Sequence, residues 1–335
     1  MNKKENKKSN KVIRDMEECF RSFHLPVHKN KSGADLDLAF TSQICNDHFC
    51  TPIAAIYCRQ SEYVALEIPF IVKVPSEKLA DTWRLFNLIN EMMPLYHYSI
   101  WKSNNGFSLI GGMFLGGDQL SASKYKSFIH DLLEDSYLCF PLIKAVIEGG
   151  NPDAIYDKFM KDNLNFVKKI NCISKKNKSK ILDDVKTALA EMKIINQEEK
   201  IFDSPLTNSQ CPETNDFRFS HRFEVSDDGK TLIFNLTSSL IVPNEKIPVI
   251  MELIGRLNEM SRHDCLYFQR ESKRIFLLSG IIIVDGVFDK KEFEVTCDFM
   301  LFWGMKVFPI INEQMSSNES PETMIKRVRE TIKCN

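Results

Sequence analysis

Long uninterrupted apolar segments are missing from the 335-residue sequence. The most apolar stretch, IFLLSGIIIVDGVF at 275–288, is interrupted twice by glycine and is shorter than the roughly 20 residues that a membrane-spanning helix needs. The N-terminal residues include several lysines but no apolar segment of the kind that a secretory signal carries. We therefore expect a cytoplasmic protein that does not contact a membrane.

An excess of charge of one sign is missing as well. Lysine and arginine total 44, aspartate and glutamate total 45, and the formal net charge is −1. Lysine–asparagine runs at 2–11 and 175–180 contain no arginine or aromatic residue, so they are typical of solvated segments. The composition argues against nucleic acid as a partner.

Short catalytic motifs are also absent: the sequence contains no GxGxxG, GxxxxGK(S/T), HExxH or GxSxG. The glycine-rich segment 109–120 has a spacing that fits no phosphate-binding loop. Its Gly111 and Gly112 fall within an expected strand, where glycine indicates a close backbone approach. We expect no catalytic residues, no cofactor and no enzymatic activity.

Two small clusters resemble parts of reactive sites. The segment CNDHFC at 45–50 resembles half of a metal site, but a zinc site usually takes two ligand pairs and no second pair appears. His263, Asp264 and Cys265 suggest a thiol next to a base, although adjacent residues rarely face one another as a nucleophile and base must. We expect no metal site, and we interpret the ten cysteines as reduced core or surface thiols.

A repeat is the strongest feature that the sequence does have. VPSEKL at 74–79 returns as VPNEKI at 242–247, an offset of 168 residues. The same offset relates NEM at 90–92 to 258–260 and FPLI at 140–143 to FPII at 308–311. Between 74 and 115, ten of 42 aligned positions are identical without a gap. This pattern predicts an internal duplication of one domain.

Both copies predict the same order of elements. A first helix is indicated by Ile13, Met16, Phe20 and Phe23 at helical spacing. A strand at 34–40 and a hairpin of 51–58 with 63–72 follow, matched by 217–225 with 231–242 in the second copy. Next come a helix, a second hairpin, a long helix at 121–147 or 289–315, and a short terminal helix. The order α-β-β-β-α-β-β-α is that of an α+β unit.

The repeated phrase itself predicts a switch from strand to helix. Its proline ends the strand, and Ser76 or Asn244 is expected to cap the following helix through its side-chain oxygen. Glu77 or Glu245 then lies in the first helical turn, where the helix dipole favours a carboxylate. A structural role accounts for the whole phrase, so neither glutamate is a catalytic candidate.

The strand at 275–282 is apolar on both alternating faces, whereas a strand with one face in water alternates apolar and polar residues. We therefore expect the two copies to cover each other as a pseudo-dimer within one chain, which would stay monomeric. The alternative is an exposed patch for a partner. The expected boundaries are a disordered basic tail at 1–10, a first repeat at 11–160, a linker at 161–177 and a second repeat at 178–332.

This layout, with its strand–Pro–Ser/Asn–Glu helix start and its Phe-Pro-Leu/Ile-Ile segment late in the long helix, resembles the YbjN-like family, which is labelled as bacterial sensory transduction regulators. That family is similar in fold to type III secretion chaperones. The resemblance covers both halves and implies a module that binds protein segments, with no active-site residues to carry over. Secretion chaperones are usually acidic single-domain dimers, whereas this chain is neutral and duplicated.

The leading functional hypothesis is a non-enzymatic, chaperone-like or regulatory module that binds a partner protein on an apolar sheet or groove surface, by strand addition at an exposed edge for example. Tyr96, Tyr98 and Trp101 are the candidate contact residues, because aromatic side chains supply much of the energy of interfaces. Core packing is the alternative interpretation of these three residues. The alternative function is a ligand-binding or enzymatic domain with a pocket between the two repeats.

Overall fold

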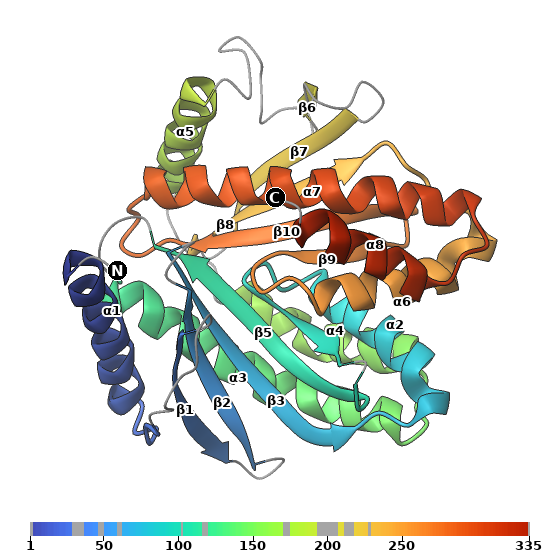
Figure 1. The fold of residues 1–335 in the computed structure, drawn as a ribbon, viewed down its shortest axis with the longest axis horizontal. Coiled ribbons are helices and arrows are strands. Elements are labelled where there is room, and N and C mark those ends of the chain that lie inside the picture. Colours follow the sequence, from blue (N-terminus) through green and yellow to red (C-terminus); the bar gives the residue numbers. More distant parts are fainter. Residues whose placement is uncertain are drawn as a thin grey trace.

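The computed structural model describes residues 3–28, 37–45, 50–58, 62–101, 103–115, 120–169, 175–192, 207–210, 218–226 and 229–333. These residues form an α+β protein in which one order of elements occurs twice (Figure 1). We call residues 3–169 the first unit and residues 175–333 the second unit.

The first unit contains, in chain order, α1 (Lys3–Ser22), β1 (Asp37–Cys45), β2 (Cys50–Cys58), β3 (Tyr63–Lys73), the 3-10 turn η1 (Ser76–Lys78), α2 (Leu79–Asn90), β4 (Tyr96–Ile100), β5 (Gly106–Phe114), α3 (Ala122–Ile147) and α4 (Pro152–Lys169). The second unit contains α5 (Lys175–Glu191), β6 (Thr207–Gln210), β7 (Arg218–Val225), β8 (Thr231–Ser238), η2 (Asn244–Lys246), α6 (Ile247–Asn258), β9 (Cys265–Gln269), β10 (Arg274–Ile282), α7 (Lys290–Ser316) and α8 (Pro321–Lys333).

Each unit has one antiparallel five-stranded sheet, and the two strand orders correspond. The first sheet runs β1-β2-β3-β5-β4 and the second runs β6-β7-β8-β10-β9. The predicted hairpins are confirmed, because β2 pairs with β3 and β7 pairs with β8. In both sheets the second hairpin places its second strand beside the first hairpin. This order leaves β4 and β9 as the edge strands that meet the other unit.

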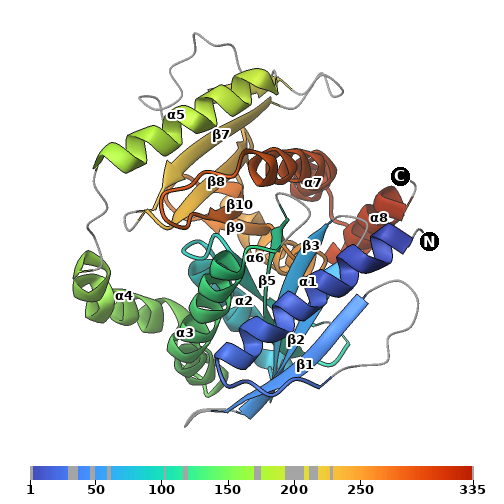
Figure 2. The ribbon, with the colours of Figure 1, turned by 90° about the vertical axis from the view of Figure 1, so that its left-hand side faces the viewer.

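Each unit has its own core between the sheet and its helices. The first core joins α1 (Met16, Phe20), the sheet (Leu66, Phe107) and α3 (Phe128). The second core joins the corresponding elements of the second unit, with Phe293 and Phe308 of α7 buried against the sheet. Figure 2 shows the second unit stacked on the first, with α5 and α7 on one side of the junction and α1, α2 and α3 on the other.

The prediction that the second face of 275–282 is covered by the other unit agrees with the described contacts. Ile282 at the end of β10 packs in the first unit's core rather than its own. A Cβ at Gly280 would lie 3.0 Å from the carbonyl oxygen of Pro94, which belongs to the first unit. The strand is therefore apolar on both faces because each face meets a different unit.

Three expectations differ from the structure. Neither Ser76 nor Asn244 caps a helix, because the helix starts with a 3-10 turn and the side chain at its cap position makes no capping hydrogen bond. The helix α1 begins at Lys3, within the expected disordered tail, and α4 and α5 extend into the expected linker. Cys50 is disulfide-bonded, so the interpretation of all cysteines as reduced thiols is wrong for this one.

The helices in the described ranges include none that is both long enough and apolar enough to cross a membrane. Of the described cysteines, five have free thiols: Cys19, Cys58, Cys139, Cys265 and Cys297.

Candidate functional site between the two units

The two units meet through reciprocal contacts of corresponding elements. The helix α2 packs on β4 of its own unit and on β9 of the other, and α6 packs on β9 of its own unit and on β4 of the other. In the same way, α3 contacts β10 and α7 contacts β5. Reciprocity of this kind is the property of an isologous, twofold interface, here formed within one chain.

The repeated asparagine of the NEM phrase holds the edge strand in both units. The Asn90 amide donates to the carbonyl of Tyr98 at 3.0 Å, and its side-chain oxygen accepts from the Tyr98 N–H at 2.7 Å. Asn258 makes the same two bonds to Leu266, at 2.9 and 2.8 Å. The identity between the copies therefore reflects a structural requirement, since an edge strand otherwise leaves backbone groups unpaired.

Across the junction, side chains of one unit satisfy the backbone of the other. Asn87 of α2 bonds both the carbonyl and the N–H of Phe268 in β9, at 2.8 and 2.6 Å. His97 of β4 lies 3.0 Å from the carbonyl of Asn258 through Nε2. Because a carbonyl only accepts, Nε2 carries the proton, and Nδ1 has no hydrogen-bond partner in the described part of the chain. Burial lowers the pKa of His97 to about 4, so the ring is neutral.

A second buried polar group lies beside His97. Nδ1 of His263 is 2.6 Å from Oδ1 of Asp264 and 2.9 Å from Oγ of Ser279, and all three residues are buried. An acyl-transfer triad needs the serine and the acid on opposite ring nitrogens, so that a proton can pass through the ring. Here both partners share one nitrogen. The trio therefore resembles a triad in composition but not in geometry.

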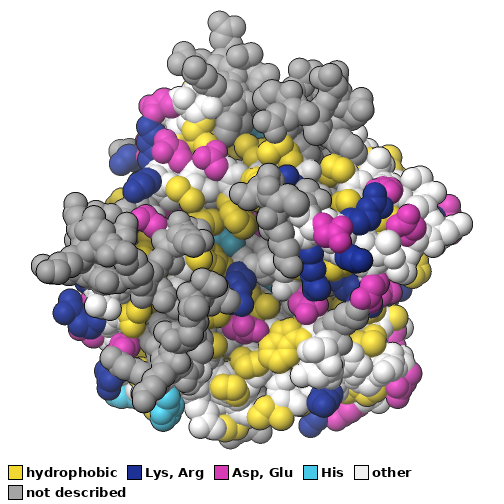
Figure 3. Space-filling view, in the orientation of Figure 1, with side chains coloured by type: hydrophobic (Ala, Val, Ile, Leu, Met, Phe, Trp, Pro, Cys, Tyr) yellow, Lys and Arg dark blue, Asp and Glu magenta, His cyan; other side chains and the backbone are white. Residues whose placement is uncertain are grey.

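A cavity of about 260 Å³ lies between the two units, next to this polar group. Its walls come from the first sheet, from the α6–β9 loop and from α7, and the lining residues are Ile56, Cys58, Tyr63, Phe114, Met260, Ser261, Arg262, His263, Phe299, Phe302 and Trp303. The lining is mostly apolar and includes five aromatic side chains besides the imidazole of His263. Figure 3 shows apolar side chains exposed on this face of the molecule.

The aromatic walls are in ring contact across the junction. Phe114 of β5 lies 5.4 Å from Phe299 of α7 and 4.7 Å from His263, between ring centroids. Tyr63 lies 5.3 Å from Phe114, and its hydroxyl donates to the carbonyl of Arg262. Burial raises the pKa of Tyr63 well above its ordinary value, so this hydroxyl stays protonated.

Arg262 is the lining residue with a fixed positive charge, and part of its guanidinium is unsatisfied. Its Nη1 atom is buried and has no hydrogen-bond partner among the described residues. An unpaired buried donor of a charged group is costly to a folded protein. The cavity thus combines an apolar aromatic wall with one cationic residue, whose Nη1 atom has no partner among the described residues.

The sequence-predicted contact residues lie elsewhere. Tyr96 and Tyr98 are buried in the core of the first unit, where the Tyr98 ring is tilted against Phe70 and Phe86 and the Tyr96 hydroxyl donates to Asp135. Trp101 is half-buried. Alternation along β4 turns the tyrosines toward their own core and turns His97 toward the other unit. In the folded protein, the side chains of these two tyrosines are almost inaccessible to a partner. A role for them in partner contact stays a prediction.

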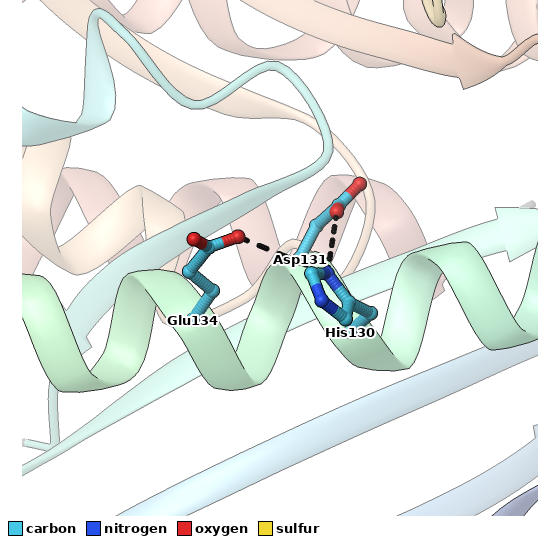
Figure 4. A group of neighbouring side chains, drawn as sticks. All are labelled: His130, Asp131 and Glu134. Carbon is cyan, nitrogen blue, oxygen red and sulfur yellow. Dashed lines mark hydrogen bonds and ion pairs between the residues drawn. The ribbon is translucent and has the colours of Figure 1, made fainter. Parts of the chain in front are cut away.

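One group of described side chains could bring three metal ligands together. His130, Asp131 and Glu134 lie on the outer face of α3, with their ligand atoms within 4.8 Å of one another (Figure 4). All three come from one helix, and the His130 side chain is 63% exposed. In the 45–50 segment, Cys50 cannot offer a thiolate because it is disulfide-bonded, and residues 46–49 lie outside the described residues.

Comparisons with known proteins give little further information. No family model matches the chain, and no curated protein matches it. One solved structure is similar, a chain of the "Crystal Structure of the ExsC-ExsE Complex", with 17% identity and a TM-score of 0.30 over 40% of this chain and 94% of that chain. Because the TM-score is low, the match identifies neither a fold family nor a ligand. The resemblance to the YbjN-like family stays a prediction.

Sequence reasoning missed the cavity residues of α7. The segment DFMLFW at 298–303 has more apolar residues than one buried helix face requires, because Phe299 and Phe302 lie beside the core positions Met300 and Trp303. An excess of aromatic residues around a helix indicates a second contact surface. Arg262 carries no such signal, since a lone arginine in a loop is ordinary.

Proposed function

We propose that this protein is a non-enzymatic binding module that holds a segment of a partner protein at the cavity between its two units. The cavity itself supports this proposal: it is apolar, aromatic and open to solvent at half-exposed Phe299 and Phe302. Well-packed aromatic pockets of this kind are where interfaces concentrate their binding energy. An apolar anchor side chain of the partner would fill the cavity, and the surrounding surface would contact the rest of the segment.

The cavity is large enough for one large apolar side chain and lies just below the usual range of small-molecule pockets. Small-molecule pockets typically enclose about 300–1,000 Å³. The volume here is about 260 Å³, which suits one large apolar side chain. The walls also come from both units, so the cavity exists only while the units stay packed together.

Peptide display tests the proposal. A library of random peptides is selected on the full chain, and the enriched peptides are titrated by calorimetry against the wild type and Phe299→Asp, which places a charge in the cavity wall. We expect selected peptides to contain an apolar anchor and to lose at least about tenfold in affinity for this variant, because a buried charge opposes an apolar side chain.

Ile71→Asp is the matched control. Ile71 is apolar and 76% exposed, and it lies eight residues along β3 from Tyr63, or roughly 26 Å at strand spacing. Binding should be unchanged in this variant. Selected peptides that bind Phe299→Asp as tightly as the wild type would overturn the proposal.

A small-molecule ligand at the same cavity is the second candidate, and the polar groups Tyr63, Ser261 and His263 on the cavity wall favour it. A thermal-shift screen with nucleotides, metals and small apolar compounds separates the two, since a ligand that binds the folded state raises the melting temperature. A shift that disappears in Phe299→Asp would support this candidate in place of the partner segment.

A further inference from the structure

Arg262 is the residue of the cavity lining that carries a fixed positive charge, and it indicates which chemical group of a partner the cavity would bind. Arg262 is the only lysine or arginine among the described residues of the cavity lining, and the other lining residues are apolar or aromatic side chains, Ser261 and His263. Its backbone carbonyl is already bonded by Tyr63, which fixes the loop from the first unit's side. Its Nη1 atom lacks a partner among the described residues and is fully buried, so a ligand in the cavity would contact the other atoms of this half-buried side chain. A carboxylate is the best-matched partner of an arginine side chain, because it accepts two parallel hydrogen bonds from the guanidinium.

A second cation lies near the same wall. The ammonium of Lys306 sits 5.4 Å over the ring of Phe302, which lines the cavity. A cation above an aromatic face is weakly held. Lys306 thus adds a cation on the ring of Phe302, a residue of the cavity lining.

The carboxylate could belong to an acidic side chain of the partner or to the end of its chain, and the position of the apolar anchor distinguishes the two. In an extended segment, neighbouring side chains point to opposite sides, so an acidic neighbour of the anchor would leave the cavity. A chain-terminal carboxylate is attached to the anchor's own Cα and enters with it. Capture of a terminal carboxylate is a known mode of peptide recognition.

From these contacts we infer that the cavity binds the carboxyl-terminal residue of a partner chain, with an apolar side chain between Phe114, Phe299 and Trp303 and the terminal carboxylate on Arg262. This inference rests on the proposed function and names the part of the partner that enters the cavity.

Two versions of one fluorescein-labelled peptide test it on the full-length protein. The probe is Gly-Ser-Gly-Ser-Gly-Ser-Gly-Phe, with a free carboxyl terminus in one version and an amide in the other. Fluorescence anisotropy should give at least about tenfold tighter binding for the free acid, since a hydrogen bond between two charged groups is stronger than one between neutral groups. A third probe with an internal glutamate before an amidated phenylalanine should bind like the amide.

Arg262→Gln is the diagnostic variant. It keeps the backbone carbonyl that Tyr63 bonds, and its melting temperature verifies that it folds. In this variant the free acid and the amide should bind equally. Arg329→Gln removes an exposed arginine of α8 and is the matched control, so the preference for the free acid should persist there.

The outcomes separate this inference from the proposal on which it rests. If acid and amide bind the wild type equally and both are weakened by Phe299→Asp, the inference is overturned and the proposed function stands. A preference for the free acid that survives Arg262→Gln also overturns it. If none of the probes binds while display-selected peptides with internal anchors do, the carboxyl-terminal mode is excluded.

Discussion

Lys124 and Glu292 lie 168 residues apart in the sequence, and Nζ of Lys124 is 2.5 Å from Oε2 of Glu292 in the structure. The separation equals the repeat offset, so the two residues occupy corresponding positions, near the starts of α3 and α7. A residue on a twofold axis meets its own copy in a dimer of identical units, which would place like charges together. Two non-identical units in one chain allow this position to be lysine on one side and glutamate on the other.

The charge pair leads to a prediction about oligomeric state. Because corresponding elements of the two units already contact each other within the chain, and because the edge strands β4 and β9 contact α6 and α2, we expect a monomer of 38.7 kDa. Light scattering after size-exclusion chromatography measures this mass. A stable particle of twice that mass would contradict the expectation that the two units satisfy each other.

Removal of one member of the pair should be strongly destabilising. Both side chains are buried, at 10% and 3% exposure, so Lys124→Met leaves an uncompensated carboxylate. We expect a loss of about 3–5 kcal/mol in the free energy of unfolding at pH 8, measured by urea denaturation. The double variant Lys124→Met/Glu292→Leu should recover most of that loss, since an apolar pair can replace a buried ion pair.

The stability cost of Lys124→Met should depend on pH, and this dependence is the control for the previous prediction. Burial raises the pKa of Glu292 to about 7, even though Lys124 acts in the opposite direction. Without Lys124 the carboxyl stays protonated at pH 5.5, so the cost of Lys124→Met should be smaller there than at pH 8. Lys144→Met, which breaks the exposed pair of Lys144 with Glu148, should change stability by less than about 1 kcal/mol at both pH values.

His97 should make the protein less stable in acid. Its pKa is about 4 in the folded protein, against an ordinary value of 6.5, because burial disfavours the charged ring. Between these values the unfolded chain binds more protons than the folded chain, so stability falls as pH falls from about 6.5 to about 4. The contribution is about 3 kcal/mol. His97→Gln should flatten this part of the stability profile, and an unchanged profile would show that the ring does not titrate in this way.

Asn87 should stabilise the contact between the two units rather than the fold of the first unit, to which it belongs. Its two bonds to Phe268 satisfy an edge strand of the other unit. In Asn87→Ala, two buried backbone groups lose their partner, at a cost of about 2 kcal/mol or more. Hydrogen exchange should increase in β9 while the core strands of the first unit stay protected. Asn318→Ala, at an exposed position, should leave β9 unchanged.

The sequence indicated the order of elements well because each element carries a local signal. Hairpins, helical spacing and the repeated proline are short-range patterns, and the structure contains the elements that they predict. The helix caps were predicted wrongly because a 3-10 turn at Ser76 and a standard first turn have the same residue preferences.

The candidate site was not visible in the sequence, because it forms where segments far apart in the chain meet. Tyr63, Arg262 and Phe299 belong to three segments, and nothing in any one of them marks a cavity. The aromatic residues of β4 were a more obvious signal, but Tyr96 and Tyr98 face their own core. Only the orientation of each strand against the other unit distinguishes a core aromatic residue from a cavity-lining one.

Cys58 reports most directly on whether a partner segment occupies the cavity between the units. Cys58 is a half-buried cysteine of the cavity lining that forms no disulfide, whereas Cys19, Cys139, Cys265 and Cys297 are buried. The rate of Cys58 alkylation is measured by mass spectrometry with and without a saturating display-selected peptide. The account predicts that the peptide slows this reaction severalfold in the wild type and in Ile71→Asp. A rate that the bound peptide leaves unchanged would show that binding takes place elsewhere.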